Sequence, residues 1–320
     1  MPIRAADTFR WRGNGAGTKS ALNDGRNWVD ATGAAHIQDH YPFYDAEGAH
    51  AGNVDGDSVL FDAAITAPAL ALAGYDASAL GDGAALKVLS AYNTTIASSG
   101  AKLLFDMQVA GQVIVDAENA GDMYLKGAGA NGIGLVQVIN TKGGSTPSVL
   151  YLDGDIDRLR ALKGKINLQA TCVISTELNI GYLTARNSDV NLTITAGATL
   201  PAIIDMSGGT ITNNVAITTL RMSDGLWTNA AGAITTAKLT GGHFYWNEGA
   251  IATAYVEGIA YLDGSGSVTP RTLALCYLGA NGRLNINNGA QSINVTALRI
   301  LGERPEIQWT PGQVIAIAAV

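Results

Sequence analysis

The chain has 320 residues, of which 47% are hydrophobic and only 15% are charged. This balance excludes a disordered chain, which needs low hydrophobicity and high charge to stay solvated. The net charge of −7 argues against sequence-independent binding to nucleic acid, because neutralising phosphates requires clustered Lys and Arg side chains. We therefore expect a folded protein with no nucleic-acid partner.

Residues 1–62 are predicted to form a loop-rich N-terminal cap. This segment holds bulky aromatic residues and three of the four histidines, separated by glycine and Asx turns. Its first residues lack the apolar stretch of a secretory signal. No apolar run in the sequence reaches the ~18 residues of a membrane-spanning helix. We expect synthesis in a cytoplasm and no membrane partner.

Two segments carry potential metal ligands. In the loop His36–His50, His36 and His40 have a spacing that serves a metal only on a helix, and Pro42 argues against one. The segment Asp153–Asp157 begins like a calcium-binding loop but lacks the glycine that an EF-hand requires at position six. We predict turn-stabilising Asp side chains here, no resident metal and no cofactor. Adventitious cation binding in either segment stays open.

Residues 63–301 are predicted to form a β-solenoid. As far as about residue 150 the apolar runs are short, and none has the 3.6-residue period of a helix. From residue 151 apolar anchors recur at a mean step of about 20 residues, which is typical of a solenoid. One turn cannot bury its own apolar face, whereas stacked turns can. The anchors are Leu159, Leu183, Ile203, Leu220, Leu239, Val256, Leu275 and Leu298.

The alternative fold is an antiparallel sandwich, because Asp224–Gly225, Asn281–Gly282 and Asn131–Gly132 are also hairpin signals. The steady spacing and the lack of long alternating strands favour an all-β, right-handed parallel β-helix with an irregular N-terminal cap. Asn residues recur at the turns, which suits stacked side-chain amides. Residues 302–320 are expected to add a C-terminal cap strand.

Cys172 and Cys276 each lie inside an apolar run. Two cysteines without histidines at ligand spacing specify neither a disulfide framework nor a zinc site. We predict that both are buried free thiols, which behave as small hydrophobic side chains.

Signs of catalysis are weak. The glycine-rich segments 13–17 and 127–134 lack the strand and helix that a phosphate-binding loop requires. No Gly-x-Ser-x-Gly nucleophile elbow occurs. Stacked turns would align acids such as Asp205 and Asp224, but we find no cluster of Asp, His and Arg in the repeat. We predict no catalytic residues and a protein that is not an enzyme.

Large aromatic residues recur at nearly one per turn in the second half of the chain. If these side chains point outward, they form a continuous apolar patch of the kind that monomers rarely expose. A homotrimer would then bury the patch, and inward stacking within the core is the alternative. The predicted interface residues are Trp227, Tyr245, Trp246, Tyr261 and Tyr277.

The opening of the chain resembles phage virion proteins that are parallel β-helices. The motifs are Trp11-Arg12-Gly13, Asn27-Trp28, Pro42 and Gly56-Asp57-Ser58-Val59-Leu60-Phe61. Members of this group decorate capsids or form tail and fibre parts, commonly as trimers. The resemblance implies a non-enzymatic capsid decoration (cement) protein on the head surface of the virion, binding the major capsid protein and forming a homotrimer. The alternatives are a receptor-binding tail or fibre protein, with or without glycan-cleaving activity, and a bacterial surface adhesin.

The resemblance makes the N-terminal cap the expected foot on the capsid. Aromatic and Arg side chains dominate interface energies, so we look for them first. The candidates are Phe9, Trp11 and Trp28 as aromatic anchors and Arg4, Arg10 and Arg12 as polar contacts. Capping of the solenoid core is the alternative role for Trp11 and Trp28.

Overall fold

The computed structural model of the chain is all-β. It describes residues 8–11, 26, 28–30, 32–36, 40–41, 44–45, 52–53, 58–61, 89–91, 109–116, 123–127, 132–141, 149–181, 189–266, 269–288, 293–310 and 314–317. These residues contain no α-helix, and among them no helix is long and apolar enough to cross a membrane. The chain divides into two compact units, residues 1–167 with 171–175 and residues 168–170 with 176–320. Each unit is described by itself.

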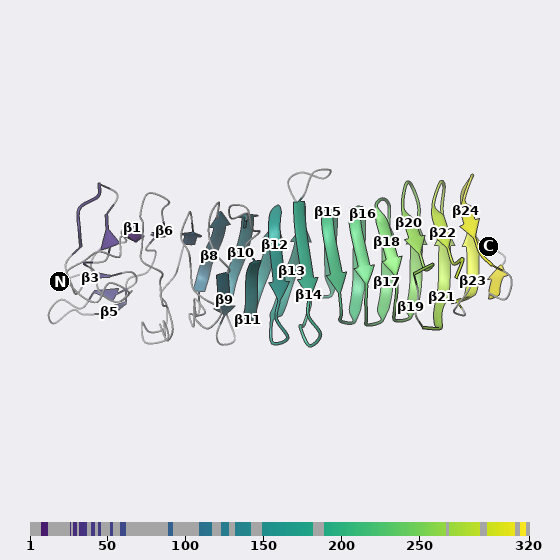
Figure 1. Cartoon of the computed structure of the whole chain (residues 1–320), viewed down its shortest axis with the longest axis horizontal. Coiled ribbons are helices and arrows are strands. Elements are labelled where there is room, and N and C mark those ends of the chain that lie inside the picture. The colour runs from purple at the N-terminus through teal and green to yellow at the C-terminus, as the bar shows by residue number, and fades with distance from the viewer. Residues whose placement is uncertain are drawn as a thin grey trace. The chain divides into compact units, whose positions relative to one another are not determined.

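Twenty-five strands follow one another along the described parts of the chain (Figure 1). They are β1 (Thr8–Trp11), β2 (Trp28–Val29), β3 (His40–Tyr41), β4 (Tyr44–Asp45), β5 (Gly52–Asn53), β6 (Ser58–Phe61), β7 (Leu89–Ala91), β8 (Val109–Asp116), β9 (Met123–Gly127), β10 (Ile133–Asn140), β11 (Val149–Ala161), β12 (Lys163–Leu168), β13 (Val173–Ile180), β14 (Asp189–Ile194), β15 (Ile203–Asn213), β16 (Ile217–Asn229), β17 (Ile234–Leu239), β18 (His243–Trp246), β19 (Ile251–Val256), β20 (Tyr261–Asp263), β21 (Arg271–Leu278), β22 (Arg283–Asn285), β23 (Ile293–Ile300), β24 (Glu306–Gln308) and β25 (Val314–Ile317).

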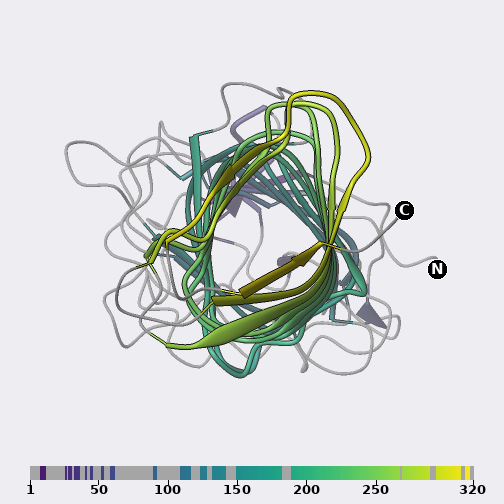
Figure 2. The same ribbon diagram turned by 90° about the vertical axis from the view of Figure 1, so that its right-hand side faces the viewer.

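Parallel pairing between successive turns confirms the predicted parallel β-solenoid, which has about eight turns. In the second unit one set of strands pairs in the order β17, β19, β21, β23 and a second set in the order β18, β20, β22, β24. Seen along the stack, the green and yellow turns overlie one another around a common interior (Figure 2). This topology excludes the alternative antiparallel sandwich.

The first unit contains two smaller sheets besides its solenoid strands. β1 pairs antiparallel with β2 and parallel with β6, and β6 continues in parallel to β7. β3, β4 and β5 form an antiparallel meander. β8, β10 and β11 pair in parallel, as do β9 and β11. At the other end of the chain β24 and β25 join the parallel ladders of the second unit. The domain boundaries at residues 62 and 301 stay predictions.

The core of the second unit is built from columns of apolar side chains, one from each turn. In one such column Ile204 pairs with Leu220, and in another Ala254 pairs with Cys276. All four of these side chains are completely buried. The first pair is closer in sequence than the second, so the turns differ in length while their hydrogen-bonded strands keep equivalent positions stacked. A single mean step describes the repeat only on average.

Most of the predicted anchors are core residues. Five are buried, namely Leu159, Leu220, Leu239, Val256 and Leu298. Two anchors are wrong. Ile203 is 39% exposed and pairs with Thr219, and Leu275 is only half-buried because it follows Thr253 in the same outward-facing column. Leu183 lies outside the described residues. The error has one cause, because in an alternating strand a shift of one residue turns a side chain to the other face.

A buried asparagine ladder confirms the stacked amides expected from the sequence. The Nδ2 group of Asn213 donates to Oδ1 of Asn229 over 2.8 Å, and both side chains are fully buried. Asn229 in turn donates to the carbonyl oxygens of Gly232 and Glu248. In the next turn Trp246 takes the same position, and its Nε1 donates to the carbonyl oxygen of Gly249. Each of these side chains thus closes the turn that follows its own strand.

Glycine at the corners lets the turns stack closely. Gly225 and Gly242 both have positive φ, +97° and +78°, which is the left-handed region that glycine tolerates best. A Cβ atom on Gly242 would lie 2.6 Å from the carbonyl oxygen of Gly225 in the preceding turn. The glycines that follow the apolar anchors in the sequence are therefore required both by backbone conformation and by close approach.

Both cysteines are buried free thiols, as predicted. The pKa of each thiol is raised from the ordinary value of 9.0 to about 12, by burial for Cys276 and by burial together with the nearby carboxylates of Asp153 and Asp155 for Cys172. The thiolate is the reactive form of cysteine, so neither side chain is placed to react in the native protein.

Replacing Asn229→Ala is expected to destabilise the solenoid by about 2 kcal/mol, because buried groups lose their hydrogen-bond partners. Thermal unfolding followed by circular dichroism measures this effect. Thr235→Ala, at an exposed position of the adjacent strand β17, is the matched control and should leave the midpoint nearly unchanged. Equal midpoints for the two variants would contradict a stabilising role for the ladder.

Native stability is expected to fall as the pH rises from about 9 towards 12. Over that range the unfolded chain releases thiol protons that the native chain retains, so ionisation favours unfolding. Denaturant midpoints at pH 8 and pH 10 measure the effect, and a variant with both cysteines changed to alanine should show a smaller decrease. A thiol reagent should label both cysteines only after unfolding, and labelling of the native protein at pH 8 would contradict the burial.

Candidate functional site

A column of long polar and aromatic side chains runs along one outer face of the second unit. It contains one residue from each successive turn, in the strands β15, β16, β17, β19, β21 and β23. We call it the cation–tyrosine ladder, and its members are Asp205, Arg221, Lys238, Tyr255, Tyr277 and Arg299. The ladder places three cations and one acid on a chain that is acidic as a whole.

Neighbouring members of the ladder contact one another. The rings of Tyr255 and Tyr277 stack with centroids 4.7 Å apart and planes 6° from parallel. Nζ of Lys238 lies 5.9 Å from the centre of the Tyr255 ring, and the guanidinium of Arg299 lies 5.7 Å from that of Tyr277. Cation–π attraction therefore continues the stack at both ends. Since their neighbours in the stack cover the ring faces, the tyrosines present mainly edges and hydroxyl groups to solvent.

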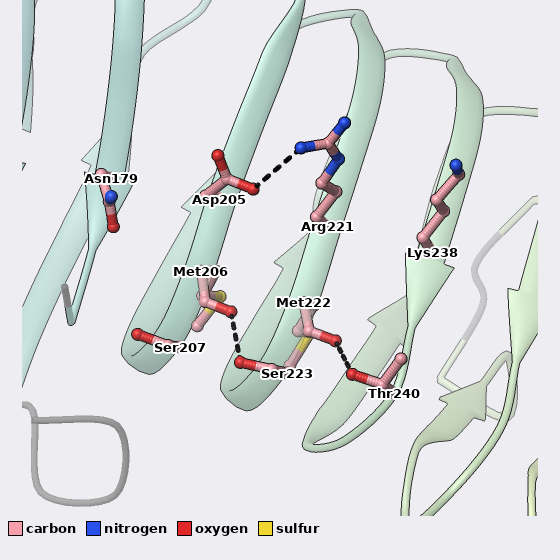
Figure 3. A pocket seen from close by; sticks show the side chains of 9 residues that line it. All are labelled: Asn179, Asp205, Met206, Ser207, Arg221, Met222, Ser223, Lys238 and Thr240. Atoms are coloured by element: carbon pink, nitrogen blue, oxygen red, sulfur yellow. Dashed lines mark hydrogen bonds and ion pairs between the residues drawn. The ribbon is translucent and has the colours of Figure 1, made fainter.

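A hollow of about 320 Å³ opens beside the acidic end of the ladder (Figure 3). Its upper side is lined by Asp205, Arg221 and Lys238, and the backbone at Met206 and Met222 lies between that side and the opposite one. Arg221 Nη1 lies 3.9 Å from Oδ1 of Asp205, and both side chains are about half exposed. Such an ion pair is weak, so most of the donors of the guanidinium stay available.

The opposite side of the hollow is a row of hydroxyl groups (Figure 3). Ser223 donates to the carbonyl oxygen of Met206 and Thr240 to that of Met222, each over 3.4 Å. Ser207 likewise donates to the carbonyl oxygen of Gly181, over 2.8 Å. Because these O–H groups are directed to backbone oxygens, their remaining lone pairs can accept hydrogen bonds. The hollow thus has cationic donors on one side and neutral acceptors on the other.

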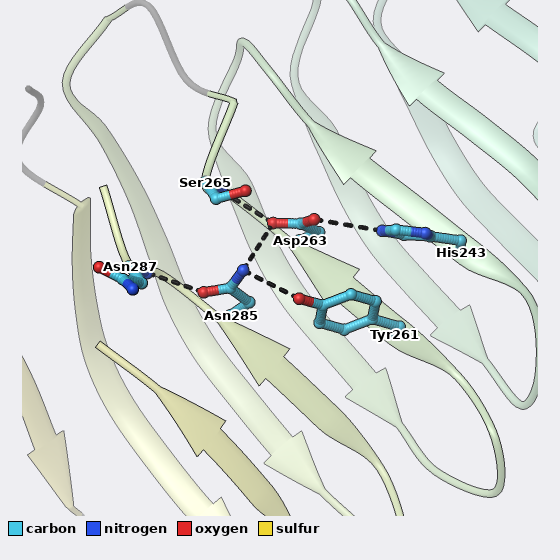
Figure 4. A network of polar contacts seen from close by, with 6 residues as sticks. All are labelled: His243, Tyr261, Asp263, Ser265, Asn285 and Asn287. Atoms are coloured by element: carbon cyan, nitrogen blue, oxygen red, sulfur yellow. Dashed lines mark hydrogen bonds and ion pairs between the residues drawn. The ribbon is translucent and has the colours of Figure 1, made fainter. Parts of the chain in front are cut away.

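A second polar cluster lies on the strands β18, β20 and β22 (Figure 4). His243 Nε2 is 3.2 Å from Oδ2 of Asp263, whose side chain is 8% exposed. Oδ1 of Asp263 accepts from Nδ2 of Asn285 and from the backbone N–H of Ser265. Asn285 also donates to the hydroxyl of Tyr261 over 2.9 Å. The buried carboxylate is therefore held by three partners, two of which come from the neighbouring turns.

The registers of adjacent strands explain why these residues meet. His243 pairs with Tyr261 and Tyr261 with Arg283, while Asp263 pairs with Asn285. The step in sequence from His243 to Tyr261 is shorter than the step from Tyr261 to Arg283. If the length of each turn were known, a search of the sequence for polar side chains one turn apart would find this cluster. The sequence alone does not give these lengths. The cluster joins Asp263 and His243 but contains no Arg, so it is not the grouping of Asp, His and Arg that was sought in the sequence.

The chemical capacity of this cluster is limited by its own contacts. The Nε2 atom of His243 faces Asp263, and the ring lies against those of Tyr245 and Tyr261 at centroid distances of 4.0 and 4.5 Å. Burial raises the pKa of Tyr261, and the charge of Asp263 raises it further. A carboxylate that orients an imidazole is one part of a proton-transfer device. Here Asp263 is held by Asn285 and Ser265, and the His243 ring is packed between two tyrosine rings. The contact between His243 and Asp263 therefore serves to link adjacent turns.

The predicted outward stripe of aromatic residues does not exist as a single surface. Trp227 and Trp246 are fully buried, so the prediction that they contact another copy of the chain is wrong and their role is in the core. Tyr245, Tyr261 and Tyr277 are half-buried. The five residues occupy five different columns, because turns of unequal length move residues with similar sequence spacing out of register. Whether the tyrosines contact another copy stays a prediction.

Phe9 and Trp28 are core residues of the first unit. Phe9 is 0% and Trp28 1% exposed. Their rings meet edge to face at 6.1 Å, and the His36 ring stacks on Phe9 at 4.3 Å. The prediction that these two aromatic side chains reach a capsid is therefore wrong. Trp28 has the core role given as its alternative, and Phe9 is buried beside it.

Of the four remaining candidates for attachment to a capsid, two lie in a described strand and two lie outside the described residues. Arg10 and Trp11 are residues of β1 and pair with Val29 and Trp28. Arg4 and Arg12 lie outside the described residues. A role for these four residues in attachment stays a prediction.

The potential cation segments have other contacts. Oδ1 of Asp153 accepts from the N–H of Gly154 over 2.9 Å and also from the hydroxyl of Thr171, as expected of an Asp that stabilises a turn. Most of the loop His36–His50 lies outside the described residues. Within the described parts of the chain, no three His, Cys, Asp or Glu side chains gather in a way that would hold a metal ion.

Comparisons of the chain with protein-family models, curated proteins and solved structures find no match. The fold by itself places the chain in the class of parallel β-solenoids. Because one fold hosts many unrelated functions, the function has to be argued from the residues of this chain.

Replacing Asp263→Ala is expected to lower stability by about 2 kcal/mol, since Asn285, His243 and the N–H of Ser265 all lose their acceptor. The thermal unfolding midpoint measures this loss. Asp189→Ala removes the same charge from an exposed position and serves as the control. If both variants unfold at the temperature of the native protein, the cluster contributes nothing to holding the turns together.

Proposed function

We propose that this chain is a non-enzymatic structural protein of a phage particle that decorates the outer surface of the capsid. The observation that carries the proposal is the pairing of the N-terminal motifs. The segments that resemble phage virion β-helix proteins lie far apart in the sequence, yet they are direct strand partners. Trp11 pairs with Trp28, and Phe9 pairs with Val59. If the motif segments belong to one structural feature, they should lie together in the folded chain. Their pairing as neighbouring strands meets this requirement and supports treating the motifs as one feature.

The physical character of the solenoid supports a structural role. The described turns are filled by stacked apolar side chains, and one corner is closed by the buried amides of Asn213 and Asn229. Since each turn contacts mainly its neighbours, the stack forms a continuous support whose ends are free to specialise. In the proposed role the major capsid protein is the partner of the N-terminal segment, and the chain acts as a homotrimer on the head surface of the virion.

Because two of the predicted aromatic anchors are buried, the set of residues expected to contact the capsid is smaller than the sequence suggested. Phe9 and Trp28 are buried in the core of the first unit. The contact candidates that remain are Arg4, Arg10, Trp11 and Arg12. Arginine is common among the residues that dominate interface energies. A tail or fibre receptor-binding protein is the second candidate function, and the exposed cation–tyrosine ladder favours it because it offers charged and aromatic groups along a side of the solenoid.

Immunogold electron microscopy on particles from lysates of the source organism separates these functions. Gold on the heads is the expected result. Gold confined to tail tips would overturn decoration in favour of receptor binding, and particles without gold would overturn both.

Charge reversal of Arg10 and Arg12 to Glu is expected to weaken binding to purified capsids about tenfold or more, because each change removes a favourable contact and adds a like charge. Co-sedimentation with capsids measures the affinity. Arg283→Glu combined with Arg304→Glu, at two exposed positions of the second unit, changes the net charge by the same amount and is the control. Equal binding by the two proteins would show that the foot lies elsewhere.

A further inference from the structure

The hollow beside the cation–tyrosine ladder has the features of a ligand site. It lies across adjacent turns, between Asn179 on β13 and Thr240 after β17 (Figure 3). Its volume of about 320 Å³ falls at the lower end of the range for small-molecule sites, about 300–1,000 Å³. A single sugar unit is of this size class. The site does not depend on the proposed place of the protein on a capsid.

Two cations on the same wall of the hollow indicate an anionic ligand group. Arg221 and Lys238 occupy the same column on neighbouring strands, which are about 4.8 Å apart in a parallel sheet. Among the residues that the structure describes, none forms an ion pair with Lys238, and Asp205 engages Arg221 only at 3.9 Å. The planar guanidinium can donate two hydrogen bonds to one carboxylate while the ammonium group adds charge from beside it.

The facing wall indicates that the ligand also carries hydroxyl groups. Ser207, Ser223 and Thr240 direct their protons to backbone carbonyl oxygens, so toward the hollow they are acceptors. The carboxylate of Asp205 adds a charged acceptor at the end of the hollow. Acceptors bind a ligand that has donors of its own. A bare phosphate dianion or an acidic peptide side chain has no such donors, whereas a sugar has several.

The strip between the two walls of the hollow is formed at Met206 and Met222, on strands β15 and β16. Their side chains are only 2% and 1% exposed, so they belong to the core and a ligand would meet the backbone here. The hollow therefore combines an anion-binding wall with a facing wall of acceptors.

We propose that this hollow binds the carboxylated sugar unit of an acidic glycan. The carboxylate lies against Arg221 and Lys238, and hydroxyl groups donate to Ser223 and Thr240. Beyond Lys238 the ladder continues with tyrosine edges and Arg299, so neighbouring sugar units of the same chain run along the stack of turns.

Isothermal titration calorimetry with the full chain tests the proposal. The probes are tetragalacturonate and sialyllactose, two acidic sugars, with methyl-esterified tetragalacturonate and tetraglutamate as the matched ligands. We expect at least one acidic sugar to bind and the uncharged ester to bind about tenfold or more weakly than tetragalacturonate, since it loses charge-assisted hydrogen bonds. Absence of binding by both acidic sugars at millimolar concentration overturns the proposal. Equal affinity for tetraglutamate overturns the sugar assignment in favour of an acidic protein partner.

Variants locate the site. Arg221→Gln and Lys238→Gln are each expected to weaken acidic-sugar binding about tenfold, and Ser223→Ala to weaken it less. Arg283→Gln removes the same charge as Arg221→Gln from strand β22 and should bind like the native protein. Arg221 and Lys238 are exposed, so their variants should unfold at the native temperature. Equal losses in the Arg221 and Arg283 variants would overturn the assignment to this hollow.

Discussion

In-register parallel pairing between successive turns is the constraint on which the rest of the structure depends. Each strand hydrogen-bonds to its equivalent one turn away, so every paired residue lies directly above or below a residue in the same position. The period in space is fixed by this pairing, while the period in sequence varies with the length of the corners. The environment of a side chain therefore depends on the column of paired positions to which it belongs, and not on its neighbours in the sequence.

The columns explain both the stability and the surface of the protein. Inward columns hold apolar residues such as Leu220 and Cys276, and one inward corner is closed by the amides of Asn213 and Asn229. Outward columns bring together side chains that the sequence keeps far apart. One such column becomes the cation–tyrosine ladder, and stacking of neighbouring strands also brings His243 to within hydrogen-bonding distance of Asp263 from the next turn. Stacking of the turns thus creates local clusters of charged and polar side chains on a repetitive fold.

The two proposed roles occupy different parts of the chain. Attachment to a capsid is assigned to the N-terminal segment, where β1 joins β2 and β6 and Phe9 packs against Trp28. Glycan binding is assigned to the side of the second unit, where long cationic side chains and short hydroxyl side chains of adjacent turns line the hollow. The first role uses irregular structure and the second uses the repeat itself. One function therefore does not require the other.

Composition and spacing alone predict the all-β class, the solenoid, the buried thiols and the amide ladder, because burial, turn residues and low charge leave a pattern along the chain. They do not predict the columns. Ile203 and Leu275 face outward and Trp227 faces inward, since a shift of one residue reverses the face of a strand. The hollow and the His243–Asp263 contact depend on turns of unequal length, and only tertiary pairing decides which residues those turns bring into register.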